Sequence, residues 1–232
     1  MTNDATLAFN RSNAMTVSNN ISGTGAVKQS GAGITELTGT TTYTGATTVD
    51  SGKLVINGNI STSSLTTVNA GGTLGGAGTV GALTVAGGTV GPGNSPGILN
   101  VAGNYSQTTG TLTVDLNGTA LGSLYDQLNV NGSVTLGGSL TGTVGYTPVN
   151  GDLLFILAND GADAISGTFS GMADMSTVTF SGFDWQITYF ANSTSNSFTG
   201  GNDIALMAIP EPNAALLVGG LGILALLRRR RV

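Results

Sequence analysis

The side chains that could do chemistry in this 232-residue chain are mostly carboxylates. The sequence contains no His and no Cys, which removes the commonest general base and all thiol chemistry. The remaining groups could support glycoside hydrolysis by two facing carboxylates, or β-elimination on an acidic sugar by a base with a cation clamp. The acids available for such roles are Asp115, Asp126, Asp152, Asp160, Asp163 and Asp174.

The sequence supplies few parts for either reaction. Outside a C-terminal arginine cluster the cations are Arg11, Lys28 and Lys53, so a cation clamp has almost no candidates. Asp160 and Asp163 could pair, but they lie in a segment of ordinary turn composition. The glycine-rich calcium nonapeptide with its fixed Asp is absent from the sequence. We therefore expect a protein that is not an enzyme and that has no cofactor or metal site.

The C-terminal stretch, residues 209–232, has the most distinctive pattern. Pro210 and Pro212, on either side of Glu211, predict an exposed non-helical hinge, because proline removes a backbone donor and favours an extended predecessor. Residues 213–227 are apolar on every side of a helical wheel, which predicts a membrane helix rather than an amphipathic surface helix. Such a helix is roughly 22 Å long against a hydrocarbon core of ~30 Å, a difference that snorkelling and local bilayer thinning can cover.

The basic end of this stretch predicts its orientation. Positive flanks stay on the cytoplasmic side, so the body of the chain is expected outside. The cluster consists of Arg228, Arg229, Arg230 and Arg231. The alternative is a buried C-terminal core helix with a solvated basic end, against which the proline motif and the arginines both argue.

Together these features resemble the PEP-CTERM sorting signal of Gram-negative bacteria, in which the tripeptide, here Pro210, Glu211 and Pro212, precedes a membrane helix and an Arg-rich end. The resemblance implies that the chain is exported, anchored in the membrane through its C-terminus, and processed by an exosortase, a membrane protease and transpeptidase. It also implies a role in envelope, exopolysaccharide or biofilm organisation.

Composition fits an exported protein. The chain has 38 Gly and only 8% charged residues, with Ser, Thr and Asn filling the polar positions. Residues 1–227 carry three cations against twelve acids, a net charge of about −9, which argues against nucleic acid as a partner. Residues 1–10 are polar and contain no signal peptide, so we expect a fragment of a longer protein.

The body of the chain shows a β pattern. Residues 1–150 consist of short apolar pairs with a period of two, separated by Gly-Gly and Asn-Gly turns, and no window keeps a helical period. The segment from Val68 to Gly75 is echoed by that from Val85 to Gly91, with Gly-Gly pairs sixteen residues apart. This spacing predicts the successive turns of a β-solenoid, and the alternative is an antiparallel sandwich or barrel.

Residues 22–60 resemble the autotransporter-associated β-strand repeat, in which a glycine-bounded strand leads through Tyr-x-Gly-x-Thr-x-Val to Gly-x-Leu. The matching segments are 31–39, 42–49 and 51–56. The resemblance extends loosely over residues 22–170 and implies a right-handed parallel β-helix. Ile34 and Glu36 depart from the family's simpler first strand.

The composition changes from Gly151 onward. Leu153 to Leu157 is a continuous apolar run, typical of a strand buried on both faces, and most aromatic residues of the chain follow it. Trp185 to Tyr189 alternates as a strand, and residues 200–206 predict a last one. A bulky, less repetitive cap of this kind is what the end of a solenoid requires.

The sequence thus predicts a β-solenoid over residues 1–150, a β cap over 151–208 and a sorting signal over 209–232. We expect a non-catalytic cell-surface or extracellular-matrix protein, acting in adhesion or in matrix organisation. The alternative is a carbohydrate-binding or carbohydrate-processing β-helix protein whose active part lies upstream of this chain.

Overall fold

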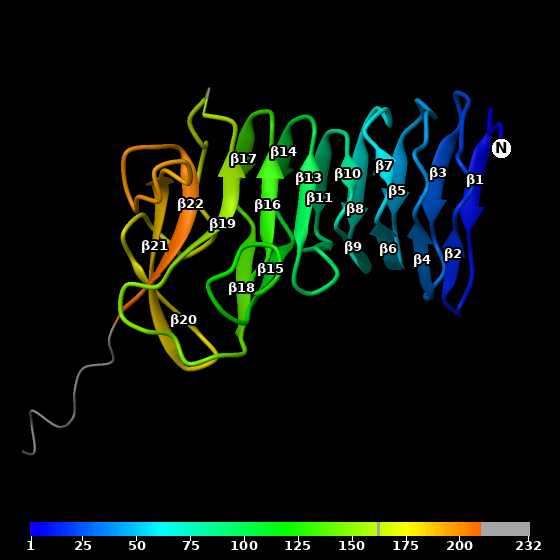
Figure 1. The fold of residues 1–232 in the computed structure, drawn as a ribbon. Coiled ribbons are helices and arrows are strands. Elements are labelled where there is room, and N and C mark those ends of the chain that lie inside the picture. The colour runs from blue at the N-terminus through cyan, green and yellow to red at the C-terminus, as the bar shows by residue number, and fades with distance from the viewer. Residues whose placement is uncertain (162, 210–232) are drawn as a thin grey trace, which may run out of the picture.

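A computed structural model describes residues 1–161 and 163–209 (Figure 1). These residues form 22 β-strands and no α-helix, so the predicted all-β class is confirmed for them. Within the same ranges no helix is long and apolar enough to cross a membrane. The predicted helix 213–227, the Pro210–Pro212 motif and the cluster 228–231 lie outside the described residues.

The strands form three sheets. The first sheet contains β1 (Thr6–Phe9), β3 (Ala26–Gln29), β5 (Thr47–Val49), β8 (Thr66–Asn69), β11 (Leu83–Ala86), β14 (Tyr105–Gln107) and β17 (Val134–Leu136). The second contains β2 (Met15–Val17), β4 (Ile34–Leu37), β6 (Gly52–Ile56), β9 (Gly72–Gly76), β12 (Thr89–Pro92), β15 (Thr111–Leu116) and β18 (Ser139–Val144). The third contains β7 (Asn59–Ile60), β10 (Thr79–Val80), β13 (Ile98–Val101), β16 (Gln127–Val130), β19 (Leu153–Asn159), β22 (Asp203–Ala208), β21 (Phe183–Ala191) and β20 (Thr177–Phe180).

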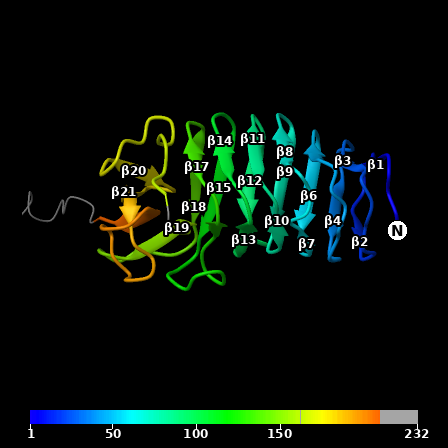
Figure 2. The ribbon, with the colours of Figure 1, turned by 90° about the horizontal axis from the view of Figure 1, so that it is seen from above.

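From β5 to β19 the chain visits the three sheets in turn, and each return to a sheet adds a strand parallel to the one before it (Figures 1 and 2). Before β5 the chain alternates between the first and second sheets. All ladders up to the β16–β19 pair are parallel, which supports the solenoid and excludes the antiparallel sandwich for this part. The sixteen-residue echo in the sequence is an observed register, because Thr73 pairs with Thr89 and Leu74 with Val90.

The interior of the solenoid is filled by columns of aliphatic side chains, one from each turn. Alternation along each short strand sends every second residue inward, where it meets its register partners from the turns on either side. The column of the second sheet is Leu54, Leu74, Val90, Leu112 and Leu140, each at most 3% exposed. Burying each such side chain contributes about 1.5–3 kcal/mol relative to leaving it in water.

The structure explains why the segment Tyr-x-Gly-x-Thr-x-Val has this sequence. Tyr43, Thr47 and Val49 are fully buried, and the Tyr43 hydroxyl lies 2.6 Å from Thr47 Oγ1, which in turn lies 2.9 Å from the Ser63 hydroxyl. A Cβ on Gly45 would lie 2.2 Å from the carbonyl oxygen of Gly25 in the preceding turn. The motif therefore satisfies buried polar atoms and lets two turns stack closely.

Antiparallel strands follow the last parallel pair. β19 pairs in parallel with β16 on one side and antiparallel with β22 on the other, and β21 and β20 continue that edge. Trp185 and Phe169 are fully buried here, while Phe190 is 55% exposed. Phe180 lies against the solenoid, since a Cβ on Gly142 would be 2.9 Å from its ring.

Candidate functional site

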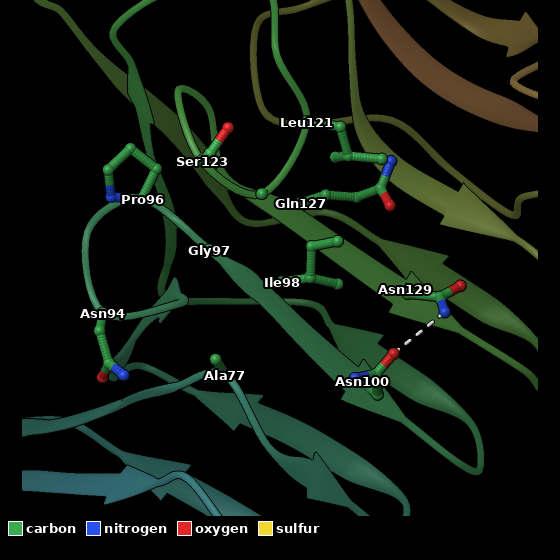
Figure 3. Close-up of a pocket in the computed structure, with 11 residues that line it drawn as sticks. Ala77, Asn94, Pro96, Gly97, Ile98, Asn100, Leu121, Ser123, Gln127 and Asn129 are labelled. Atoms are coloured by element: carbon green, nitrogen blue, oxygen red, sulfur yellow. Dashed lines mark hydrogen bonds between the residues drawn. The ribbon is translucent and has the colours of Figure 1, made fainter.

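A shallow groove of about 570 Å³ lies on the outer face of the third sheet (Figure 3). We call it the amide groove, because Asn and Gln supply four of its side chains. It is lined by Ala77, Asn94, Pro96, Gly97, Ile98, Asn100, Leu121, Gly122, Ser123, Gln127 and Asn129.

Asn100 and Asn129, on the floor of the amide groove, belong to a ladder of polar residues across neighbouring strands. Asn59, Thr79, Asn100 and Asn129 are consecutive register partners on β7, β10, β13 and β16. Asn129 Nδ2 donates to Asn100 Oδ1 at 3.1 Å (Figure 3). Asn100 Nδ2 donates to the Gly78 carbonyl at 3.3 Å. These bonds fix two parallel amides in one orientation above the sheet.

One wall of the groove is an inserted loop, residues 117–126. Strands β10 and β13 pair residues 21 apart, Thr79 with Asn100, whereas β13 and β16 pair residues 29 apart, Ile98 with Gln127. The extra residues fold back through an antiparallel bridge between Leu116 and Tyr125. The loop leaves Leu121 46% exposed and Leu124 43% exposed.

The other wall is the connection from β12 to β13, residues 93–97. Asn94 Nδ2 donates to Asn57 Oδ1 at 3.0 Å, which ties this loop to the turn before it. The Gly97 amide donates to Asp126 Oδ1 at 2.7 Å, which ties it to the inserted loop. The two walls are therefore joined to each other beneath the groove.

Asp126 makes that junction with both oxygens, since its Oδ2 accepts from the Asp115 amide at 2.8 Å. Burial raises the pKa of Asp126 to about 6, although the two amide bonds and Lys53 oppose the rise. Asp115 lies beside it, accepts the Ser95 hydroxyl, and raises the pKa of Asp126 further through its charge. Both carboxylates line a cavity of about 140 Å³ that Lys53 also lines.

Asp115 and Asp126 are two candidate acids from different segments, a strand and a loop, that the structure places next to each other. Because both oxygens of Asp126 already accept backbone N–H bonds, its carboxylate acts as a brace between loops. Its cavity is about a quarter of the size of the amide groove. No group of three His, Cys, Asp or Glu residues suited to a metal occurs in the described ranges.

Two of the other candidate acids, Asp152 and Asp174, hold nearby groups through their carboxylates. Asp152 accepts from the Tyr146 hydroxyl and the Val149 amide, and Asp174 from the Thr188 hydroxyl and the Tyr189 amide. Asp160 and Asp163 lie in the loop after β19, where the Asp163 carbonyl accepts the side-chain amide of Asn202.

Sequence reasoning missed the amide groove, although one signal for it was present. Ile98-Leu-Asn-Val101 and Gln127-Leu-Asn-Val130 share the tripeptide Leu-Asn-Val, and the shared Asn residues are the register partners of the floor. The inserted loop places the two copies 29 residues apart, which hides them from a search at the spacing of the other turns.

No model of a known protein family matches the chain, and no curated protein matches it either.

Proposed function

We propose that this chain is a non-catalytic, exported cell-surface or extracellular-matrix protein of a Gram-negative bacterium. In this proposal a PEP-CTERM signal sorts and anchors it, an exosortase-type enzyme processes that signal, and the body is a right-handed β-helix that helps to organise exopolysaccharide or biofilm. The observation that carries the proposal is an extended solenoid (Figure 2) whose outward faces present ladders made mainly of hydroxyl and amide side chains.

Those ladders follow from the register of the strands. The first sheet presents the outward ladder Thr48, Thr67, Thr84, Ser106 and Thr135. The second presents Thr73, Thr89, Thr111 and Ser139. Each of these side chains is partly exposed, so the surface offers hydroxyl groups at the regular spacing of strands, about 4.8 Å. Such a surface meets a hydrated polysaccharide matrix by hydrogen bonding rather than by charge.

Sorting is tested by replacing Pro210, Glu211 and Pro212 with three alanines in the bacterium that encodes the protein. We expect the variant to reach the membrane but to keep its unprocessed mass, because processing is proposed to require the tripeptide. Mass spectrometry of membrane and extracellular fractions measures this. The matched control places three alanines at 148–150, an exposed loop where Val149 is 68% exposed. Equal mature masses in wild type and the 210–212 variant would contradict sorting by this motif.

A second candidate function, carbohydrate binding, is favoured by the amide groove. It differs from the proposal that the active part lies upstream, because the groove belongs to this chain. The two functions are compatible, since a matrix protein can act by holding a glycan.

A further inference from the structure

We propose that the amide groove binds a neutral glycan, a stretch of uncharged hexose residues. The inference rests on the proposed function as a matrix protein and names the site and the class of ligand. It stands on three observations: the inserted loop, the amide ladder and the absence of charge among the eleven lining side chains.

The first observation is the place of the groove in the solenoid. A regular turn leaves a sheet face flat, and an insertion in one turn raises a wall over it, so insertions commonly mark the binding face of repeat proteins. Here residues 117–126 form the wall, and Gly122 lets it approach the sheet, because a Cβ there would lie 3.1 Å from Ile98. The resulting volume, about 570 Å³, is within the usual range of about 300–1,000 Å³ for ligand sites.

The second observation is the chemistry of the floor. An amide side chain both donates and accepts hydrogen bonds, as a sugar hydroxyl does. Asn129 spends one N–H on Asn100, and its Oδ1 accepts no hydrogen bond from the residues that the structure describes. Asn94 is likewise bonded through Nδ2, and no donor to its Oδ1 occurs among those residues. Both acceptors are therefore available to hydroxyl groups of a ligand.

Apolar side chains complete this arrangement. Ile98 lies on the floor and Leu121 on the wall, with Leu121 46% exposed (Figure 3). Alternating polar and apolar contacts suit a pyranose ring, whose hydroxyl groups point outward from a C–H surface. A site with few precisely placed polar groups beside apolar ones is the general form of a small-molecule site.

The third observation selects a neutral ligand. The lining residues include no Lys, Arg, Asp or Glu, so a polyanionic glycan finds no cation in the groove. Residues 1–227 carry three cations against twelve acids, and this excess of negative charge repels a polyanion. An uncharged hexose polymer meets neither difficulty.

The test is titration calorimetry with the full 232-residue chain in mild detergent. The neutral probes are cellohexaose, dextran and a galactomannan, and the polyanionic probe is alginate. We expect measurable binding of at least one neutral probe and none of alginate. No binding of any neutral probe, or tighter binding of alginate, would overturn the proposal.

Substitutions at the amide groove test whether the groove is the binding site. Replacing Asn100 and Asn129 together with Ala should weaken binding of the neutral probe about tenfold, because the free acceptor of Asn129 and the Asn100 side chain that orients it are both lost. Leu121→Ser, on an exposed loop position that leaves the sheet intact, should weaken it about threefold. The matched control Asn69→Ala removes a strand asparagine of the first sheet and should bind as wild type does.

Circular dichroism and thermal unfolding check that each variant is folded. If folded Leu121→Ser and the folded double variant both bind the probe as tightly as wild type, the assignment of binding to the amide groove is wrong. The sorting experiment separates the two proposals. If the chain is processed at its C-terminus but binds no neutral probe, only the glycan site is contradicted. If the chain binds a neutral probe but is never processed, only the sorting proposal is contradicted.

Discussion

Asp126, in the inserted loop, connects the loop 93–97 of the preceding turn to strand β15. It holds the Gly97 amide at one oxygen and the Asp115 amide at the other, and only 3% of it is exposed. The cost of desolvating its charge exceeds the gain from these bonds, so its pKa rises to about 6. The stability of the fold therefore depends on the protonation of this carboxylate, and so on pH.

The sign of this coupling follows from the raised pKa. The folded chain binds the Asp126 proton more tightly than the unfolded chain, whose value is near 3.8. Its contribution to stability is therefore fully present below pH 3.8 and is lost as pH rises to about 6, by up to about 3 kcal/mol. Urea unfolding of wild type and Asp126→Asn at pH 4, 5, 6 and 7 measures it.

We expect wild type to lose stability relative to Asp126→Asn across that window. The pKa of Asp50 is lowered by its bond to Lys28, so its contribution is lost below about pH 3.8, outside the window. Parallel pH profiles in the two proteins would contradict the role of Asp126.

The Tyr43 hydroxyl provides a second prediction at the scale of residues. Tyr43→Phe removes a partner of the buried Thr47 hydroxyl and keeps the ring in place, so we expect a loss of about 1 kcal/mol in the free energy of unfolding. The matched control is Tyr146→Phe, whose hydroxyl donates to Asp152 in a partly exposed loop, and it should cost less. Urea unfolding at pH 7 compares them, and an equal loss in both variants would argue against the buried network.

At the scale of elements, the turns of the solenoid depend on close backbone approach. Gly45 has no positive φ, so its need for glycine comes from the Gly25 carbonyl, 2.2 Å from where a Cβ would lie. Gly45→Ala should therefore destabilise by about 1–3 kcal/mol through overpacking.

The control for this change is Gly171→Ala. Gly171 has φ of +74° and no atom within 4 Å of its virtual Cβ, so the substitution isolates conformational strain, about 1 kcal/mol. Thermal unfolding compares the two variants. We expect Gly45→Ala to lose more stability than Gly171→Ala, and a Gly45→Ala protein as stable as wild type would show that the turns can separate without cost.

The strands themselves were largely predictable, because alternation and glycine punctuation directly encode short strands with one buried face. The run from Leu153 to Leu157 was predicted as a strand buried on both faces, and β19 is almost fully buried. The groove was not predictable in the same way. It depends on how residues 117–126 fold back, and the pairing of Asp115 with Asp126 follows from that loop rather than from the spacing of the turns.

For the whole molecule, the antiparallel strands β20, β21 and β22 cover the end of a ladder that would otherwise present unpaired backbone. Ending the chain after Asn159 removes them and exposes one edge of β19, where Leu154 and Ile156 are now fully buried. We expect this shortened chain to associate into oligomers or aggregates at micromolar concentration. Light scattering after size exclusion measures the change, with the chain ending at Ile209 as control. A monomeric shortened chain would show that the cap is dispensable.

The parallel ladders also determine how the molecule responds to a pulling force. Hydrogen bonds between turns run along the long axis, and Met1 and the cap lie at opposite ends of that axis (Figure 1). A pull between the ends therefore loads a few bonds at a time and peels one turn after another. The register of Lys53 with Thr73 makes a turn of 20 residues, and the release of that turn adds about 65 Å of chain in place of a strand spacing of about 4.8 Å. If this solenoid attaches a cell to a matrix, as we propose, the attachment would lengthen in steps under flow.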